Sequence, residues 1–156
     1  MTIEVLLPRK NLDPFRRESL NDREAGLLKA LLAEYGVTSE THSRVVELFA
    51  GDAPHALMMA NLGRDVRNIV CVDRYLPVEP LVEGVKWRHL DLFQLSEALI
   101  FGEPLPQSVI NLQYKGDVVI AINEWWRNRE TFDNVVDYFC RPGGLAYTLR
   151  GVRIRE

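Results

Sequence analysis

The feature that most constrains the fold is the alternation of short, strongly apolar runs with segments of helical periodicity. Five apolar runs read as buried strands, at 44–50, 68–72, 85–90, 117–122 and 145–149. Segments with helical spacing fall at 54–62, 93–101 and 129–140. Apolar strands that alternate with helices are typical of a parallel sheet with both faces covered. The sequence therefore predicts a Rossmann-like, doubly wound α/β fold with a mostly parallel sheet of about five strands.

Length and composition are those of one globular domain spanning residues 1–156. Hydrophobic residues make up 47% of the chain and charged residues 26%, an ordinary mix for a soluble domain. The strand and helix pattern occupies residues 41–150, and residues 1–40 read as a helical N-terminal extension. The helix of this extension is expected to start at Asn21 with a capping box and to end at Gly36.

The charge balance argues against a strongly basic nucleic-acid-binding protein. Lys and Arg number 19 and Asp and Glu number 22, so the formal net charge is −3. A nucleic acid remains a possible partner that the charge does not support. No apolar run is long enough to span a membrane, so a cytoplasmic location is expected. Cys71 and Cys140 both stand in apolar contexts and are expected to be buried free thiols.

Small and acidic residues follow the first predicted strand, at the end where open parallel sheets bind their ligands. The segment ELFAGDAPH holds Glu47 and then Gly51, which permits a close backbone approach to a ligand. Amides at the start of the next helix suit a carboxylate or a phosphate. Asp52 either caps this helix or contacts the ligand. His55, in the first helical turn, is a possible site residue, although a histidine on the helix surface is the commoner reading.

Acidic residues also follow the second and third predicted strands. Asp73 comes 22 positions after Gly51, and a carboxylate at this place can accept hydrogen bonds from both hydroxyls of a ribose. Asp91 can accept a hydrogen bond from the exocyclic amine of an adenine, with Leu92 or Phe93 packed on the base. An equally good interpretation of Asp91 is a cap for the next helix.

The fourth predicted strand ends in INEWW. Asn123 can pair with polar ligand groups, and Trp125 and Trp126 can wall a substrate pocket. Glu124 is a weak candidate for a general base. The three histidines of the chain lack the spacing of metal ligands, so no metal is expected.

Together these strand ends resemble the class I S-adenosylmethionine-dependent methyltransferases from about residue 44 to residue 149. The segment VVELFAGDA is similar to the first motif of that family, CVD to the second and HLDL to the third. DVVIAINEWW and the later RPGGLAYTL look like the fourth strand and the Pro-Gly-Gly turn of many small-molecule methyltransferases. The resemblance implies a set of residues that bind S-adenosylmethionine, namely Glu47, Phe49, Ala50, Gly51, Asp52, Asp73, Arg74, Asp91, Leu92 and Asn123.

The resemblance also implies methyl transfer to an acceptor, with a small molecule favoured and Trp125, Trp126 and His55 beside it. The chain departs from the family in two ways. Phe49 and Ala53 stand where first motifs usually carry glycines. The sheet is expected to stop near its fifth strand, without the family's usual C-terminal hairpin. A homo-oligomer or a partner subunit would then complete the acceptor site.

Two other functions are compatible with the same residues. A catalytically inactive, methyltransferase-like subunit that binds a nucleotide or acts as a scaffold fits the lost glycines and the absence of a clear base. A dinucleotide-dependent oxidoreductase fits a loose glycine-rich pattern formed by Gly51, Ala53 and Ala56. Pro54 interrupts that pattern, and Ala53 would hinder the approach of a pyrophosphate.

Overall fold

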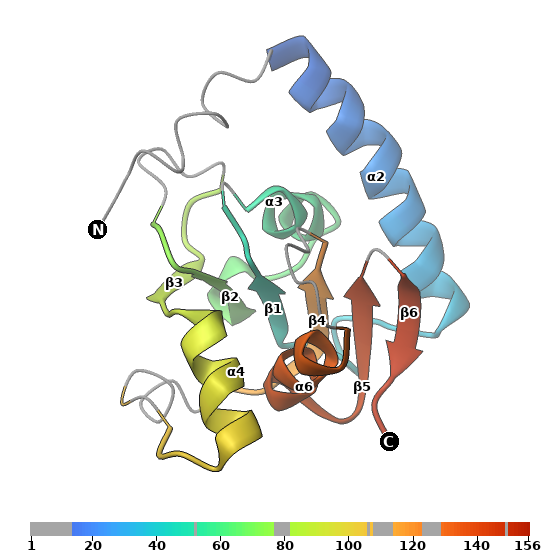
Figure 1. The fold of residues 1–156 in the computed structure, drawn as a ribbon. Coiled ribbons are helices and arrows are strands. Elements are labelled where there is room, and N and C mark those ends of the chain that lie inside the picture. Colours follow the sequence, from blue (N-terminus) through green and yellow to red (C-terminus); the bar gives the residue numbers. More distant parts are fainter. Residues whose placement is uncertain are drawn as a thin grey trace.

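The computed structural model of the chain describes residues 14–51, 53–76, 82–105, 107, 114–122, 129–148 and 150–156. Within these residues a six-stranded sheet has the order β3-β2-β1-β4-β5-β6 (Figure 1). The strands are β1 (Val45–Leu48), β2 (Ile69–Asp73), β3 (Lys86–His89), β4 (Gly116–Ala121), β5 (Cys140–Thr148) and β6 (Gly151–Ile154). Neighbouring strands from β3 to β5 pair in parallel, and β6 is antiparallel to β5.

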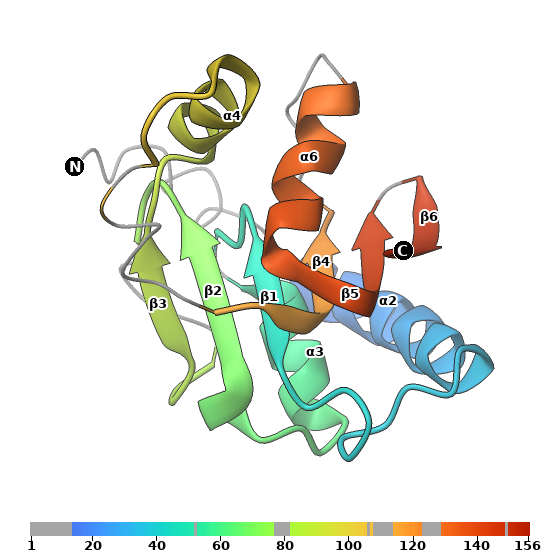
Figure 2. The same cartoon turned by 90° about the horizontal axis from the view of Figure 1, so that it is seen from below.

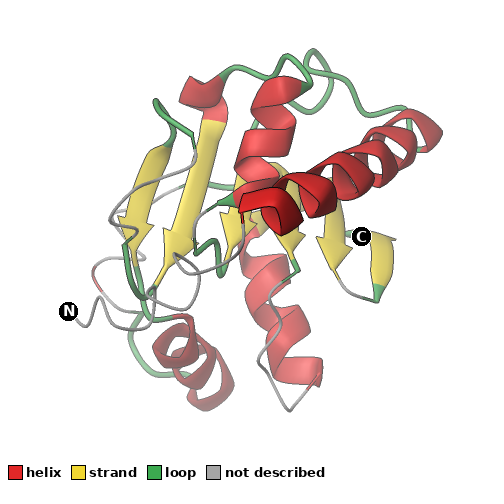
Figure 3. Cartoon of the chain, turned by 90° about the horizontal axis from the view of Figure 1, so that it is seen from above, coloured by secondary structure: helices red, strands yellow, loops and turns green. Residues whose placement is uncertain are grey.

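Helices cover both faces of the sheet, as the alternating pattern predicts. The helical elements are α2 (Pro14–Glu34), α3 (Pro54–Asn61), the short 3-10 helix η2 (Val66–Asn68), α4 (Leu92–Phe101) and α6 (Arg129–Phe139). Views along the sheet show α2 and α3 on one side and α4 and α6 on the other (Figures 2 and 3). The core is accordingly divided into two apolar clusters, one on each face. None of the helices in the described part of the chain is apolar over a bilayer's thickness.

The sheet extends one strand further than the sequence predicts. Residues 151–154 form β6 and make an antiparallel hairpin with β5, so the expected five-stranded sheet without a C-terminal hairpin is wrong. Gly151 adopts a φ of 111°, which a residue with a side chain rarely adopts, and this allows the tight return of the chain. Arg150, Arg153 and Arg155 make this end of the chain basic, so the sequence indicates a solvated tail. Only the pairing with β5 identifies it as an edge strand.

The N-terminal helix also differs from expectation at its start. It begins at Pro14, a residue well suited to the first helical turn, so Asn21 lies inside the helix and does not cap it. Its end is as predicted. Gly36 has a φ of 66°, and the amide of Val37 donates to the carbonyl of Leu32 at 2.8 Å, as in a Schellman motif.

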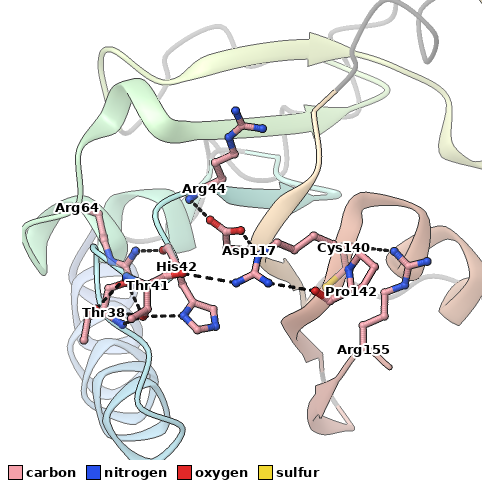
Figure 4. A network of polar contacts seen from close by, with 10 residues as sticks. Thr38, Thr41, His42, Arg44, Arg64, Asp117, Cys140, Pro142 and Arg155 are labelled. Carbon is pink, nitrogen blue, oxygen red and sulfur yellow. Dashed lines mark hydrogen bonds and ion pairs between the residues drawn. The ribbon is translucent and has the colours of Figure 1, made fainter.

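A polar cluster fastens the connection between α2 and β1 to the amino ends of the strands (Figure 4). Asp117 accepts a hydrogen bond from the amide of Arg44 at 2.9 Å and forms an ion pair with Arg141. Arg64 is buried and donates to the carbonyl of His42. We refer to Arg44, Arg64, Asp117 and Arg141 as the amino-edge cluster. Each contact joins segments far apart in sequence, so the cluster holds the end of α2 against the sheet.

Candidate functional site

The loop between β1 and α3 adopts the backbone of a glycine-rich turn although it contains a single glycine. Phe49, Gly51 and Ala53 have φ angles of 54°, 59° and 61°. Left-handed conformations are disfavoured for residues with a Cβ atom and cost about 1–2 kcal/mol each. Phe49 and Ala53 are the two positions where the resemblance expects glycine. The loop therefore adopts the left-handed backbone of a glycine-rich motif although two of the expected glycines are replaced by Phe49 and Ala53.

Asp73 ties this loop to the end of β2. Its Oδ2 atom accepts a hydrogen bond from the amide of Gly51 at 2.7 Å, and its Oδ1 atom accepts one from the amide of Tyr75 at 3.1 Å. The side chain is half-buried, and each carboxylate oxygen can accept more than one hydrogen bond. The hydrogen bond from Gly51 to Asp73 thus brings a partly exposed carboxylate and a tight backbone turn together.

Asp91 lies next to this pair but caps a helix. Its Oδ1 atom accepts hydrogen bonds from the amides of Phe93 at 3.0 Å and Gln94 at 3.3 Å. The helix-capping interpretation of Asp91 is therefore confirmed. Its Oδ2 atom lies 3.8 Å from Nε of Arg74, an expected cofactor residue that directly follows Asp73 in the chain.

The structure distinguishes the two residues that follow Asp91, either of which was expected to pack on the base. Leu92 is buried in the cluster beneath α4 and α6, whereas Phe93 is exposed. A base bound beside Asp91 would therefore meet Phe93 rather than Leu92. Sequence alone could not separate the two, because the rotation of α4 about its axis is set by packing.

Glu47 is buried under the first turn of α3. The side chain is 2% exposed, and its Oε1 atom accepts a hydrogen bond from the amide of Ala56 at 2.8 Å. Its Oε2 atom lies 3.4 Å from Nδ1 of His55. His55 is itself 5% exposed, so its expected place on the helix surface is wrong. The reason is that the first turn of α3 sits directly over β1, with the imidazole between Glu47 and Tyr147.

The side chain of Phe49 packs towards α6. Its ring stacks on that of Phe132 with centroids 6.0 Å apart, and the guanidinium of Arg150 lies over the Phe132 ring at 5.3 Å. These contacts anchor the first residue of the loop, which helps to hold its left-handed backbone. Arg150, at the turn between β5 and β6, had no predicted role.

We call the group formed by Phe49, Gly51, Ala53, Asp73 and Asp91 the carboxyl-edge site. Asp52, Asn123, Glu124, Trp125 and Trp126, also predicted to contribute, lie outside the described residues. Among the residues that are described, no three His, Cys, Asp or Glu side chains gather to hold a metal ion.

Both cysteines are buried and free, as predicted. Burial raises the pKa of the Cys140 thiol to about 11, and burial next to Glu47 raises the pKa of Cys71 far above its usual range. Both therefore remain protonated at neutral pH, and neither is poised as a nucleophile. Compared with other proteins, the chain matches no family model and finds no match among curated sequences.

Proposed function

We propose that the protein is an S-adenosylmethionine-dependent methyltransferase that acts on a small-molecule acceptor. The observation that supports this most is the hydrogen bond of 2.7 Å between the Gly51 amide and the Asp73 carboxylate. It joins a left-handed turn to an acid at the end of the adjacent parallel strand. This is the place and the chemistry by which α/β sheets hold the ribose of a nucleotide cofactor.

The described residues are compatible with the cofactor. Asp73 would receive the ribose hydroxyls, because its partly exposed oxygens retain acceptor capacity beside their two main-chain donors. Asp91 and Phe93 would lie on the adenine side. The methyl group of Ala53 is 0% exposed and packs in the core cluster under α3, so it is not presented to a ligand at the surface.

In this reaction the main task of the protein is to position the cofactor relative to the methyl acceptor. Bound S-adenosylmethionine supplies an electrophilic methyl group on its sulfonium. The chain would hold the nucleoside through Asp73 and the backbone at Gly51, and so fix the direction from which an acceptor approaches. Such positioning needs no metal and no covalent intermediate with the enzyme.

Calorimetric titration with S-adenosylhomocysteine, S-adenosylmethionine and NAD tests this proposal. We expect binding of the first two, and we expect Asp73→Ala to weaken it about 30-fold or more, the equivalent of about 2 kcal/mol. The matched control is Asp65→Ala, because Asp65 also accepts a hydrogen bond from the amide two residues ahead but lies before η2. Binding of NAD alone would select the oxidoreductase instead.

A second candidate is an inactive scaffold or nucleotide-binding subunit built on the same fold. It is favoured by Phe49 and Ala53, which hold left-handed conformations that glycine would adopt without cost. If none of the three compounds binds while the protein remains folded, the scaffold is the better description.

A further inference from the structure

Basic residues line the amino edge of the sheet, at the opposite end of the strands from the carboxyl-edge site. Each strand has one at or next to its end on this edge. In the spatial order β3-β2-β1-β4-β5-β6 they are Lys86, Arg67, Arg44, Lys115, Arg141 and Arg155. We call these six residues the amino-edge row. The formal net charge of −3 conceals the row, because its members come from segments far apart in the sequence.

The strand directions explain how the row forms. Arg44 and Lys115 directly precede β1 and β4, and Lys86 is the first residue of β3. Strand β6 runs the other way, so the residue that follows it, Arg155, reaches the same edge (Figure 4). There its guanidinium donates to the carbonyl of Cys140, the first residue of β5. Neighbouring strands lie about 4.8 Å apart, so the row extends roughly 24 Å across the sheet.

Most of these charges are not neutralised within the described part of the chain. Carboxylates there pair with two members of the row, Asp65 with Arg67 at 2.8 Å and Asp117 with Arg141. The four members without an ion pair to a described residue are Lys86, Arg44, Lys115 and Arg155. The row therefore keeps an excess of positive charge.

The middle of the row is open to solvent. Arg44 and Lys115 are both exposed. The guanidinium of Arg44 lies 5.3 Å from the ring centroid of Tyr114, and Nζ of Lys115 lies 3.6 Å from that of Tyr138. A cation over an aromatic ring is positioned without being neutralised. Burial lowers the pKa of Lys115, and the charge of Arg155 lowers it further, which indicates a positive potential along this edge.

We propose that the amino-edge row binds the phosphate backbone of a single-stranded nucleic acid. Such a strand is a linear chain of anions, and the row is a linear set of cations with one on each strand of the sheet. Four of the six are arginines, whose planar set of donors fits phosphate oxygens. A duplex presents two backbones on a curved surface, and an acidic protein has no regular line of charge, so both fit the row less well.

This inference goes beyond the proposed function and does not rest on it. The row lies at the end of the strands remote from Asp73 and Asp91. The bound nucleic acid is therefore treated as a partner distinct from the methyl acceptor.

Fluorescence anisotropy of the full chain with a labelled oligouridylate of about 12 nucleotides tests the proposal. We expect a Kd between about 1 and 100 µM at about 50 mM KCl, as for binding that depends on phosphate contacts alone. Each phosphate contact on a single strand contributes about −0.7 to the slope of log K against log salt. The four cations without a carboxylate partner therefore predict a slope of about −3.

Arg44→Gln and Lys115→Gln each remove one cation from the middle of the row. Each should weaken binding about fivefold to tenfold at about 50 mM KCl and reduce the steepness of the slope by about 0.7. Arg44 contributes its amide, not its guanidinium, to the hydrogen bond with Asp117, so we expect this variant to fold normally. The matched control is Arg23→Gln, which removes an exposed arginine of α2 and should change neither the Kd nor the slope.

Several results would overturn the inference. One is an oligouridylate that does not bind at low salt, and another is a slope that neither substitution in the row changes. An equal loss in Arg23→Gln would show a response to overall charge rather than to the row. Tighter binding of a duplex or of polyglutamate would assign the row to a different partner. None of these results affects the binding of S-adenosylhomocysteine, so the proposed function is tested separately.

Discussion

Asp117 at the amino edge of the sheet and Asp73 at the carboxyl edge are both acidic, but they bind different kinds of donor. At the amino edge, Asp117 pairs with the guanidinium of Arg141 and with one amide. At the carboxyl edge, Asp73 binds two main-chain amides, at Gly51 and Tyr75. Burial alone would raise the pKa of Asp117, but the amide of Arg44 and the Arg141 guanidinium bring that pKa below its usual value.

This difference separates a cluster that stabilises the fold from a cluster suited to a ligand. A carboxylate that already forms an ion pair with a guanidinium has less capacity to bind a ligand. A carboxylate that accepts only from neutral amides has a defined direction and further lone pairs, which suits hydroxyl donors. The comparison predicts that loss of Asp117 alters stability, whereas loss of Asp73 alters binding of the cofactor.

The largest effect on stability is expected from Asp117→Ala. The substitution leaves the amide of Arg44 and the partly buried guanidinium of Arg141 without their acceptor, and should lower the free energy of unfolding by about 2–3 kcal/mol. Urea denaturation measures this loss. Calorimetry of the folded protein should give an unchanged Kd for S-adenosylhomocysteine. A weakened Kd would show that the two edges are coupled and break the comparison.

Gly51→Ala should have the next largest effect, and it should act on both properties. The methyl group forces a residue with a Cβ atom into a φ of 59°, which costs about 1–2 kcal/mol of stability. It also displaces the amide that binds Asp73, so the Kd for S-adenosylhomocysteine should rise. Thermal denaturation and calorimetry on one preparation test both parts. Normal binding with reduced stability would mean that the loop is structural only.

Much of the fold could be predicted because buried strands and helix faces require apolar residues at regular spacings in the sequence. The strand ending at Asp73 and the helix ending before Gly36 were placed within a residue or two. Strand β6 was not predicted, because it is held by its pairing with β5 and by the contact of its one arginine, Arg153, with Asp137 of α6 at 2.7 Å. Contacts between separate elements of this kind leave no local pattern in the amino-acid sequence.

The candidate site was predictable in part for the same reason. The spacing of Gly51 and Asp73 follows from the length of one strand-helix-strand unit, so their meeting could be anticipated. The direction of Glu47 and the burial of His55 could not, because they depend on how α3 sits on β1. Periodicity indicates that a helix has a buried face but does not say which polar residue at its first turn is enclosed.

The pH dependence of stability should report the amino edge. Because the folded protein lowers the pKa of Asp117, the unfolded chain binds the proton more tightly. The contribution of the ionised group is therefore complete above its unfolded pKa of about 3.9 and is lost as the pH falls through the lower folded value. We expect wild type to exceed Asp117→Asn by about 1 kcal/mol at pH 7 and by progressively less below pH 4. In an Arg141→Met background this pH dependence should shrink, and urea denaturation at several pH values measures it.

The smallest expected effect is that of Ala53→Gly, which tests whether the loop is strained. Glycine removes about 1–2 kcal/mol of left-handed strain, but it loses a buried methyl group worth about 0.8 kcal/mol and adds freedom to the unfolded chain. The net change in stability should lie within about 0.5 kcal/mol of zero, measured by urea denaturation beside Gly51→Ala. The same substitution at Ala56, in the first turn of α3, has no left-handed strain to relieve and should be plainly destabilising. An equal loss at both positions would mean that the backbone at Ala53 is not strained and that the loop does not need glycine at this position.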